Sequence, residues 1–191
     1  MIGEKVYLRI LERSDISTTQ KWITDPEISA IMGYLPTKSL AQQEQWYDAI
    51  LNDNTRYIFA ICLIESSQHI GNVALGNIDY VSRNAMLSIF IYEKKQRRAG
   101  YGSEATRLIL DFAFNRLNLH RVYLQTSSGF HGAIRMYESL GFVKEGILRE
   151  HYYINGQYSD KIIYSILRQE YERNPALGSD SARETKCYAE R

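Results

Sequence analysis

One stretch decides most of the fold and of the site: Lys94-Lys95-Gln96-Arg97-Arg98-Ala99-Gly100-Tyr101-Gly102, which joins a predicted strand to a long predicted helix. The two glycines let the backbone turn sharply and approach a ligand closely. The free N–H groups at the start of the helix then point at an anion, and a pyrophosphate fits this arrangement. The four cations before the turn could meet further phosphate charge, arginine more specifically than lysine. On these residues alone, a solvated basic loop before an ordinary helix is an equally good interpretation.

The residues before this stretch predict a strand, three helices and then a meander. Alternating apolar residues predict strands over residues 5–11, 57–64, 70–78 and 85–92. Helix starts are indicated by Asp15, by Asp25-Pro26 and by Ser39. The last three strands, separated by turn-prone segments, indicate an antiparallel meander. This meander and the glycine spacing exclude a dinucleotide-binding fingerprint, and a Walker loop would carry Lys-Ser or Lys-Thr.

The residues after the stretch alternate between helix and strand. A helix is predicted over residues 101–117, because apolar residues recur there with the period of an amphipathic helix. A strand over residues 121–126 and a helix over residues 131–140 follow, and Gly141 ends that helix. A long strand begins at Phe142, turns at Asn155-Gly156 and returns over residues 158–167.

Composition limits the class of protein. The 191 residues predict one domain over residues 1–173, and residues 174–191, which lack periodicity, are expected to form a mobile tail. The 23 Lys and Arg balance 22 Asp and Glu, so nucleic acid is not expected as a partner. The apolar runs are far shorter than the roughly 20 residues that cross a bilayer, so no membrane partner and a cytoplasmic location are expected. The two cysteines and four histidines lack metal-ligand spacing, which predicts no metal. The oligomeric state stays open, a homodimer among the options.

The glycine stretch and four later segments resemble a known family. Arg97 to Gly102, followed by Ser103-Glu104-Ala105, resembles the acetyl-CoA loop of the GCN5-related N-acetyltransferases, the GNAT superfamily. The later segments, residues 117–124, 133–138, 141–142 and 154–158, resemble its RimJ/RimL branch, which includes the spermidine acetyltransferases. This resemblance implies an α/β (α+β) fold, with a mixed, mostly antiparallel seven-stranded sheet. Its fourth and fifth strands splay apart, and about four helices flank the sheet.

The resemblance also implies a site. Acetyl-CoA is the cosubstrate, and an amine attacks its thioester directly. The positions that match the family's cofactor contacts are Phe90, Ile91, Tyr92, Arg97, Arg98, Ala99, Gly100, Tyr101, Gly102, Ser103 and Phe130. Tyr137 matches the tyrosine that protonates the departing thiolate, and its ordinary pKa near 10 keeps it protonated at neutral pH. Without the resemblance, Tyr137 reads as a residue on the buried face of a helix.

Two positions depart from the family pattern. Phe130 replaces an asparagine that contacts the cofactor, and Met86 replaces a glutamate that is a candidate general base. An α-amine with a pKa near 7.8 is about 14% neutral at pH 7, whereas a lysine-like amine near 10.4 is only about 0.04% neutral. Losing a base therefore costs a lysine-like acceptor more, unless Ser88, Glu150 or His151 provides another path.

The acceptor cannot be identified from the sequence. Candidate acceptor contacts are Tyr34, Trp46, His151 and Tyr153. Between Pro26 and Gln43 the charged residues are Glu27 and Lys38, so that loop lacks the acidic cluster that a polyamine would favour. We expect a small-molecule or peptide amine, foremost a protein N-terminal α-amine or an amino sugar. A polyamine acceptor, or a CoA-binding sensor without catalysis, are the alternatives.

Overall fold

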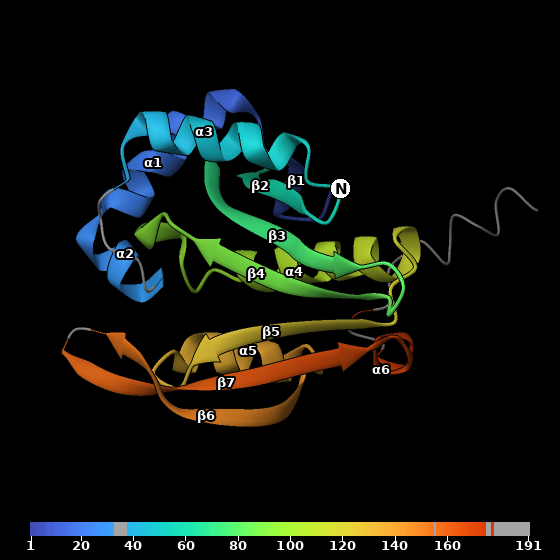
Figure 1. Cartoon of the computed structure of the whole chain (residues 1–191). Coiled ribbons are helices and arrows are strands. Elements are labelled where there is room, and N and C mark those ends of the chain that lie inside the picture. Colours follow the sequence, from blue (N-terminus) through green and yellow to red (C-terminus); the bar gives the residue numbers. More distant parts are fainter. Residues whose placement is uncertain (33–37, 155, 175–176, 178–191) are drawn as a thin grey trace, which may run out of the picture.

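Seven strands form one sheet in the order β1-β2-β3-β4-β5-β7-β6 in a computed structural model of the chain (Figure 1). The structure describes residues 1–32, 38–154, 156–174 and 177. The strands are β1 (Val6–Ile10), β2 (Tyr57–Leu63), β3 (His69–Asp79), β4 (Asn84–Ile91), β5 (Arg121–Ser127), β6 (Val143–Ile154) and β7 (Gln157–Leu167). The predicted mixed sheet is thereby confirmed. Most of the expected tail, residues 174–191, lies outside the described residues.

The described residues contain six α-helices, two more than the roughly four that the resemblance implied. They are α1 (Ile16–Thr24), α2 (Pro26–Met32), α3 (Leu40–Leu51), α4 (Tyr101–Asp111), α5 (His131–Ser139) and α6 (Arg168–Arg173). The α3 start is a capping box, in which the Ser39 hydroxyl accepts the Gln42 N–H at 3.3 Å. Gly141 follows Leu140, the C-cap residue of α5, and adopts φ 85°. This left-handed conformation is the one expected of a glycine that ends a helix.

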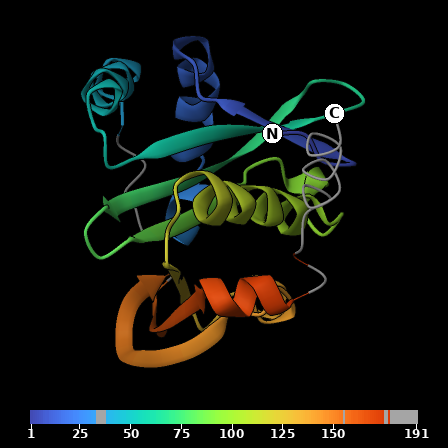
Figure 2. The same cartoon turned by 90° about the vertical axis from the view of Figure 1, so that its right-hand side faces the viewer.

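The helix α6 was not predicted, because its six residues carry little apolar periodicity. Its anchor is Tyr171, which is buried against the Phe114 ring with centroids 4.8 Å apart. The Tyr171 hydroxyl donates to Asp111 of α4 at 3.3 Å, and Figure 2 shows α6 beneath α4. The α4 helix itself does not run to residue 117 as an α-helix. It ends in a π-helical turn over Phe112–Arg116, where the Leu117 N–H donates to the Phe112 carbonyl.

The sheet is antiparallel except at one point. Strands β2 to β4 form the predicted meander, β1 pairs antiparallel with β2, and β7 pairs antiparallel with both β5 and β6. Between the two halves, β4 and β5 pair in parallel through residues 84–86 and 121–123. Beyond these three pairs β4 and β5 diverge, and Figure 1 shows the divergence toward the side of α2 and the β6–β7 hairpin. This divergence confirms the predicted splay of the fourth and fifth strands.

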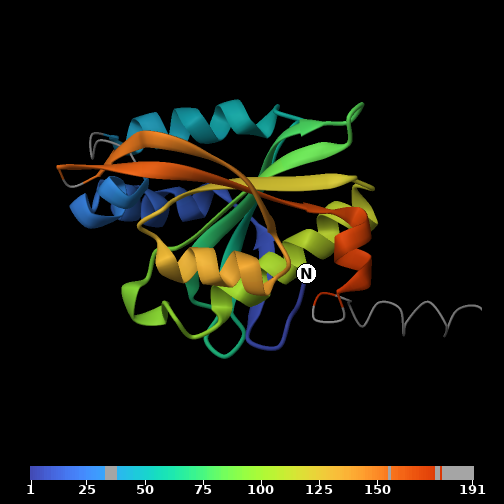
Figure 3. The same cartoon turned by 90° about the horizontal axis from the view of Figure 1, so that it is seen from below.

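The main core lies between the sheet and the helices α4 and α5. Its fully buried side chains include Leu75 of β3, Ile109 and Leu110 of α4 and Ile166 of β7. Figure 3 shows α4 and α5 on one side of the sheet and α3 on the other. A smaller cluster lies beneath α3 on the β1–β2 half. The main core continues across the junction of β4 and β5, because it contains Leu87 of β4 and Leu124 of β5.

Candidate active site

The backbone of β4 is exposed to the split between β4 and β5. Past Met86, β4 continues along β3 alone, and the two strands keep an unbroken register to Ile91. The Tyr92 N–H donates to the Ile70 carbonyl at 2.9 Å, on the β3 side. Because backbone groups alternate along an antiparallel strand, those of Ile89 and Ile91 point the other way, into the split. The Ile91 carbonyl accepts from the Arg97 Nε, which leaves the Ile91 N–H and the Ile89 N–H and carbonyl to hold an extended, amide-containing ligand without a bulge in β4.

The start of α4 lies at the end of this split. Gly100 precedes the helix in the left-handed conformation, with φ 89°. The first helical bond runs from the Glu104 N–H to the Gly100 carbonyl, so the N–H groups of residues 101–103 are left for another acceptor. A Cβ added to Gly102 would lie 3.5 Å from the Met136 Sδ and 3.8 Å from the Ile91 Cγ1. The helix start is therefore packed between β4 and α5, and its free N–H groups could bind an anion there.

The four cations of the loop divide into two faces. A 3-10 turn covers Lys94–Gln96, and residues three apart lie above one another in such a turn. Lys94 and Arg97 lie on one face and contact Glu27 of α2. The other two, Lys95 and Arg98, are exposed and make no ion pair with any residue that the structure describes. The sequence separated the two arginines from the two lysines, whereas the structure separates Lys94 and Arg97 from Lys95 and Arg98.

Arg97 is tied to the end of β4. Its Nε donates to the Ile91 carbonyl at 2.9 Å and one Nη to the Tyr92 carbonyl at 3.4 Å, and its guanidinium lies over the Phe90 ring. The hydrogen bond to Glu27 raises the pKa of the neighbouring Lys94 above its ordinary value. The next residues of the loop after Arg98, Ala99 and Gly100, are exposed to solvent.

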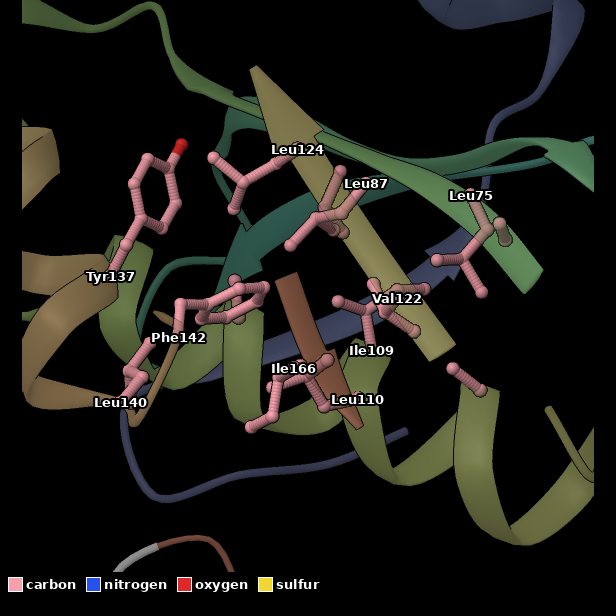
Figure 4. Packing of buried hydrophobic residues seen from close by; sticks show 14 of the residues in the cluster. Leu75, Leu87, Ile109, Leu110, Val122, Leu124, Tyr137, Leu140, Phe142 and Ile166 are labelled. Atoms are coloured by element: carbon pink, nitrogen blue, oxygen red, sulfur yellow. The ribbon is translucent and has the colours of Figure 1, made fainter. Parts of the chain in front are cut away.

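Tyr137 projects from α5 into one end of the main core (Figure 4). Its side chain is buried, its ring packs against Phe142 with centroids 5.7 Å apart, and Figure 4 shows its hydroxyl on the side of Leu124. Burial raises the pKa of Tyr137 to about 12. The phenol is thus protonated at any physiological pH, and the group can act as an acid but not as a base.

The face of the sheet opposite α4 and α5 is open beside the split. The side chains of Met86 and Ser88 on β4 and of Tyr123 and Gln125 on β5 alternate onto this face, and Ser88 and Gln125 are exposed. An acceptor could reach the split from here while the cofactor occupies the other side. β4 presents no carboxylate on this face, because Met86 and Ser88 occupy its positions.

Three other predicted site residues lie directly before α5 and in β6. Phe130 lies half-buried directly before α5, where its N–H donates to the Ser127 carbonyl. His151 lies in an irregular part of β6, where the register against β7 shifts between Leu148 and Tyr152. Tyr153 is 66% exposed and lies against Tyr158 across the hairpin.

Trp46 is separated from these hairpin residues. It packs on the cluster beneath α3, against β1 and β2, at the opposite end of the strand order from β6. The structure therefore does not bring Trp46 together with His151 or Tyr153. Tyr34 lies outside the described residues.

Three residues where α1, α2 and the end of β4 meet were not predicted from the sequence as part of the site: Trp22, Glu27 and Glu93. Trp22 stacks on Tyr92 with centroids 4.6 Å apart, and its Nε1 donates to Glu93 at 3.1 Å. Glu27 binds the loop cations as described above. These contacts join residues about 70 positions apart, and no local signal in the sequence marks them.

A CoA thioester matches this arrangement, with its phosphates at the start of α4 and its amide-containing arm along the free side of β4. The fold and the site thus define the class of CoA-dependent acyltransferases. Residues 5–143 match the family model described as the Acetyltransferase (GNAT) domain, so the chain belongs to the GNAT N-acetyltransferases. Its cosubstrate is acetyl-CoA, and the predictions of family, fold and enzyme class are confirmed.

The chain is similar to spermidine acetyltransferases along most of its length. It is 32% identical to spermidine N(1)-acetyltransferase of Vibrio cholerae serotype O1 over 172 residues, which cover 89% of this chain and 97% of the relative. It is 30% identical to the Escherichia coli K12 enzyme of the same name, covering 88% of this chain and 89% of that one. The crystal structure of the Vibrio cholerae spermidine N-acetyltransferase with CoA and spermine superposes with a TM-score of 0.84 at 30% identity, covering 90% of this chain and all of that one.

The described residues include neither a candidate membrane span nor a candidate metal site. No helix among them is long and apolar enough to cross a membrane. Within the same residues, no three His, Cys, Asp or Glu side chains are grouped so that they could hold a metal ion.

Proposed function

We propose that this acetyltransferase acetylates a primary amine of an aliphatic polyamine. The observation that carries the proposal is the similarity to two spermidine acetyltransferases, at 30% identity or more over nearly nine-tenths of the chain. From the sequence we expected a protein N-terminal α-amine or an amino sugar first, and the similarity to the spermidine enzymes favours the polyamine alternative. The RimJ/RimL branch, the single domain over residues 1–173, a cytoplasmic location and a homodimer stay predictions.

The proposed mechanism assigns a role to each part of the split. The N–H groups at the start of α4, with Lys95 and Arg98, hold the phosphates, and the backbone of Ile89 and Ile91 holds the arm and polarises the thioester carbonyl. A neutral amine attacks that carbonyl from the open face. The C–N bond forms, the C–S bond breaks, and Tyr137 gives its proton to the departing thiolate. The attacking nitrogen releases its extra proton to water on the open face, and a solvent proton restores the Tyr137 phenol. His151 and Tyr153 of the hairpin are proposed to contact the acceptor.

A second candidate acceptor is a protein N-terminal α-amine. The open face of β4 carries Met86 and Ser88 rather than a carboxylate, so the amine must lose its proton without a base on this strand. At pH 7 an α-amine is neutral roughly 300 times more often than a lysine-like amine. This difference favours the α-amine.

An amine panel separates these candidates. We expect release of free thiol from acetyl-CoA with spermidine or spermine at a kcat/KM at least tenfold above that with an N-terminal peptide or an amino sugar. A preference for the peptide would replace the polyamine by the second candidate. Binding of CoA without turnover of any amine would favour the sensor.

The pH profile should follow the amine and not the acid. Because burial raises the pKa of Tyr137 to about 12, the acid keeps its proton through pH 10. The neutral fraction of a lysine-like amine rises about tenfold per pH unit from pH 7 to 9. We therefore expect kcat/KM for spermidine to rise steadily over this range with no fall before pH 10, measured by thiol release. A falling limb below pH 10 in enzyme that regains full activity at pH 8 would contradict the assignment of Tyr137.

A further inference from the structure

The contact between α2 and the cofactor loop is an ion-pair bridge that involves half of the loop's cations. The Lys94 Nζ lies 2.5 Å from one oxygen of Glu27 and 3.7 Å from Asp25, and an Arg97 Nη lies 3.6 Å from the other oxygen of Glu27. Asp25 is also engaged by its own backbone, because its Oδ1 accepts the Glu27 and Ile28 N–H groups. Glu27 is therefore the carboxylate that joins both cations.

The Lys94–Glu27 pair is exposed, and the Arg97 side chain in the second pair is 28% exposed. The Glu27 side chain is 53% exposed and that of Lys94 is 47% exposed. An exposed ion pair changes an equilibrium constant by only about fivefold or less. A phosphate, which carries more charge than a carboxylate, can displace such a partner. The bridge also lies close to the proposed phosphate site, because Lys94 and Arg97 come a few residues before the start of α4 at Tyr101.

We propose that Glu27 competes with the phosphate groups of CoA for Lys94 and Arg97. This inference rests on the proposed cofactor site at the start of α4. In the free enzyme, Glu27 holds the two cations on the α2 side of the 3-10 turn. When CoA binds, its phosphates form ion pairs with these cations, and the ion pairs to Glu27 must weaken. Glu27 thereby lowers the affinity for CoA, although it makes no contact with the reacting atoms.

The test compares two variants that remove the same charge. Glu27→Gln removes the bridge, and Glu172→Gln is the matched control. Glu172 is 56% exposed and pairs with Arg168 of its own helix at 3.5 Å, in α6. CoA binding is measured by titration calorimetry at low and at high salt, and a thermal melt verifies that each variant is folded.

We expect Glu27→Gln to bind CoA about three to ten times more tightly than the unmodified chain at low salt, because the Glu27 carboxylate no longer competes for two cations. The gain should shrink at high salt, where exposed charges are screened. Glu172→Gln should stay within twofold. Unchanged or weaker binding by folded Glu27→Gln, or an equal gain in the control, would overturn the competition. Failure of the unmodified chain to bind CoA would instead overturn the cofactor site, and the inference with it.

Discussion

Replacing Tyr137 by phenylalanine should lower kcat for acetyl transfer about 10²-fold, at the low end of the range for loss of a general acid. The thiolate of CoA is a moderately good leaving group, so water can replace the acid in part. The substitution removes one oxygen from a side chain that is 7% exposed, and its ring contact with Phe142 is kept. The free energy of unfolding should therefore change by less than about 1 kcal/mol. Stopped-flow measurement of thiol release gives kcat, and urea unfolding gives stability.

The control for this variant is Tyr164→Phe. Tyr164 belongs to the same buried cluster, with its ring centroid 6.3 Å from that of Tyr137, but its hydroxyl donates to Glu138 at 2.8 Å. Losing this hydrogen bond should cost about 0.5–1.5 kcal/mol of stability and leave kcat within about threefold. An unchanged kcat in Tyr137→Phe would remove Tyr137 from the mechanism. Equal losses of kcat in both variants would show that the cluster acts through packing alone.

Local signals in the sequence were reliable where one residue sets the backbone. Ser39 predicts a helix start, and its hydroxyl makes the expected bond to the Gln42 N–H. Gly141 predicts a helix end and has the positive φ, 85°, that this requires. Gly100 predicts a sharp backbone turn before a helix and has φ 89° before α4. In each case the signal and the structure it determines lie within four residues.

Contacts between segments far apart in the chain could not be predicted from the sequence. Glu27 binds Lys94 across 67 residues, and Trp22 binds Glu93 across 71 residues. Neither pair has a spacing that one sequence could reveal, so the division of the loop cations could not be predicted. The parting of β4 from β5 was implied by the family resemblance and not by periodicity. For the same reason, the acceptor residues, which come from separate elements, stay predictions.

Replacing Gly71 by alanine should damage both the fold and the cofactor site. Gly71 pairs with Ile91 at the end of β4, and an added Cβ would lie 2.3 Å from the Phe90 carbonyl oxygen and 3.0 Å from the Ile91 Cα. These are backbone atoms, so β4 must shift away from β3 at the segment whose free side faces the split. We expect a loss of about 1–3 kcal/mol in the free energy of unfolding from this overpacking. A misplacement of β4 of about 1 Å should lower kcat/KM for acetyl-CoA by roughly 10²-fold.

A matched control lies five residues further along β3. A Cβ added at Gly76 would meet nothing closer than the Arg56 Nε at 3.9 Å, so Gly76→Ala keeps the strand and its pairing with Met86. Alanine also restricts the unfolded chain more than glycine does, so Gly76→Ala should be neutral or stabilising by up to about 1 kcal/mol. If Gly71→Ala lost stability but kept its kcat/KM, the end of β4 would not position the thioester. If both variants lost kcat/KM equally, the effect would come from β3 as a whole and not from the backbone at Phe90 and Ile91.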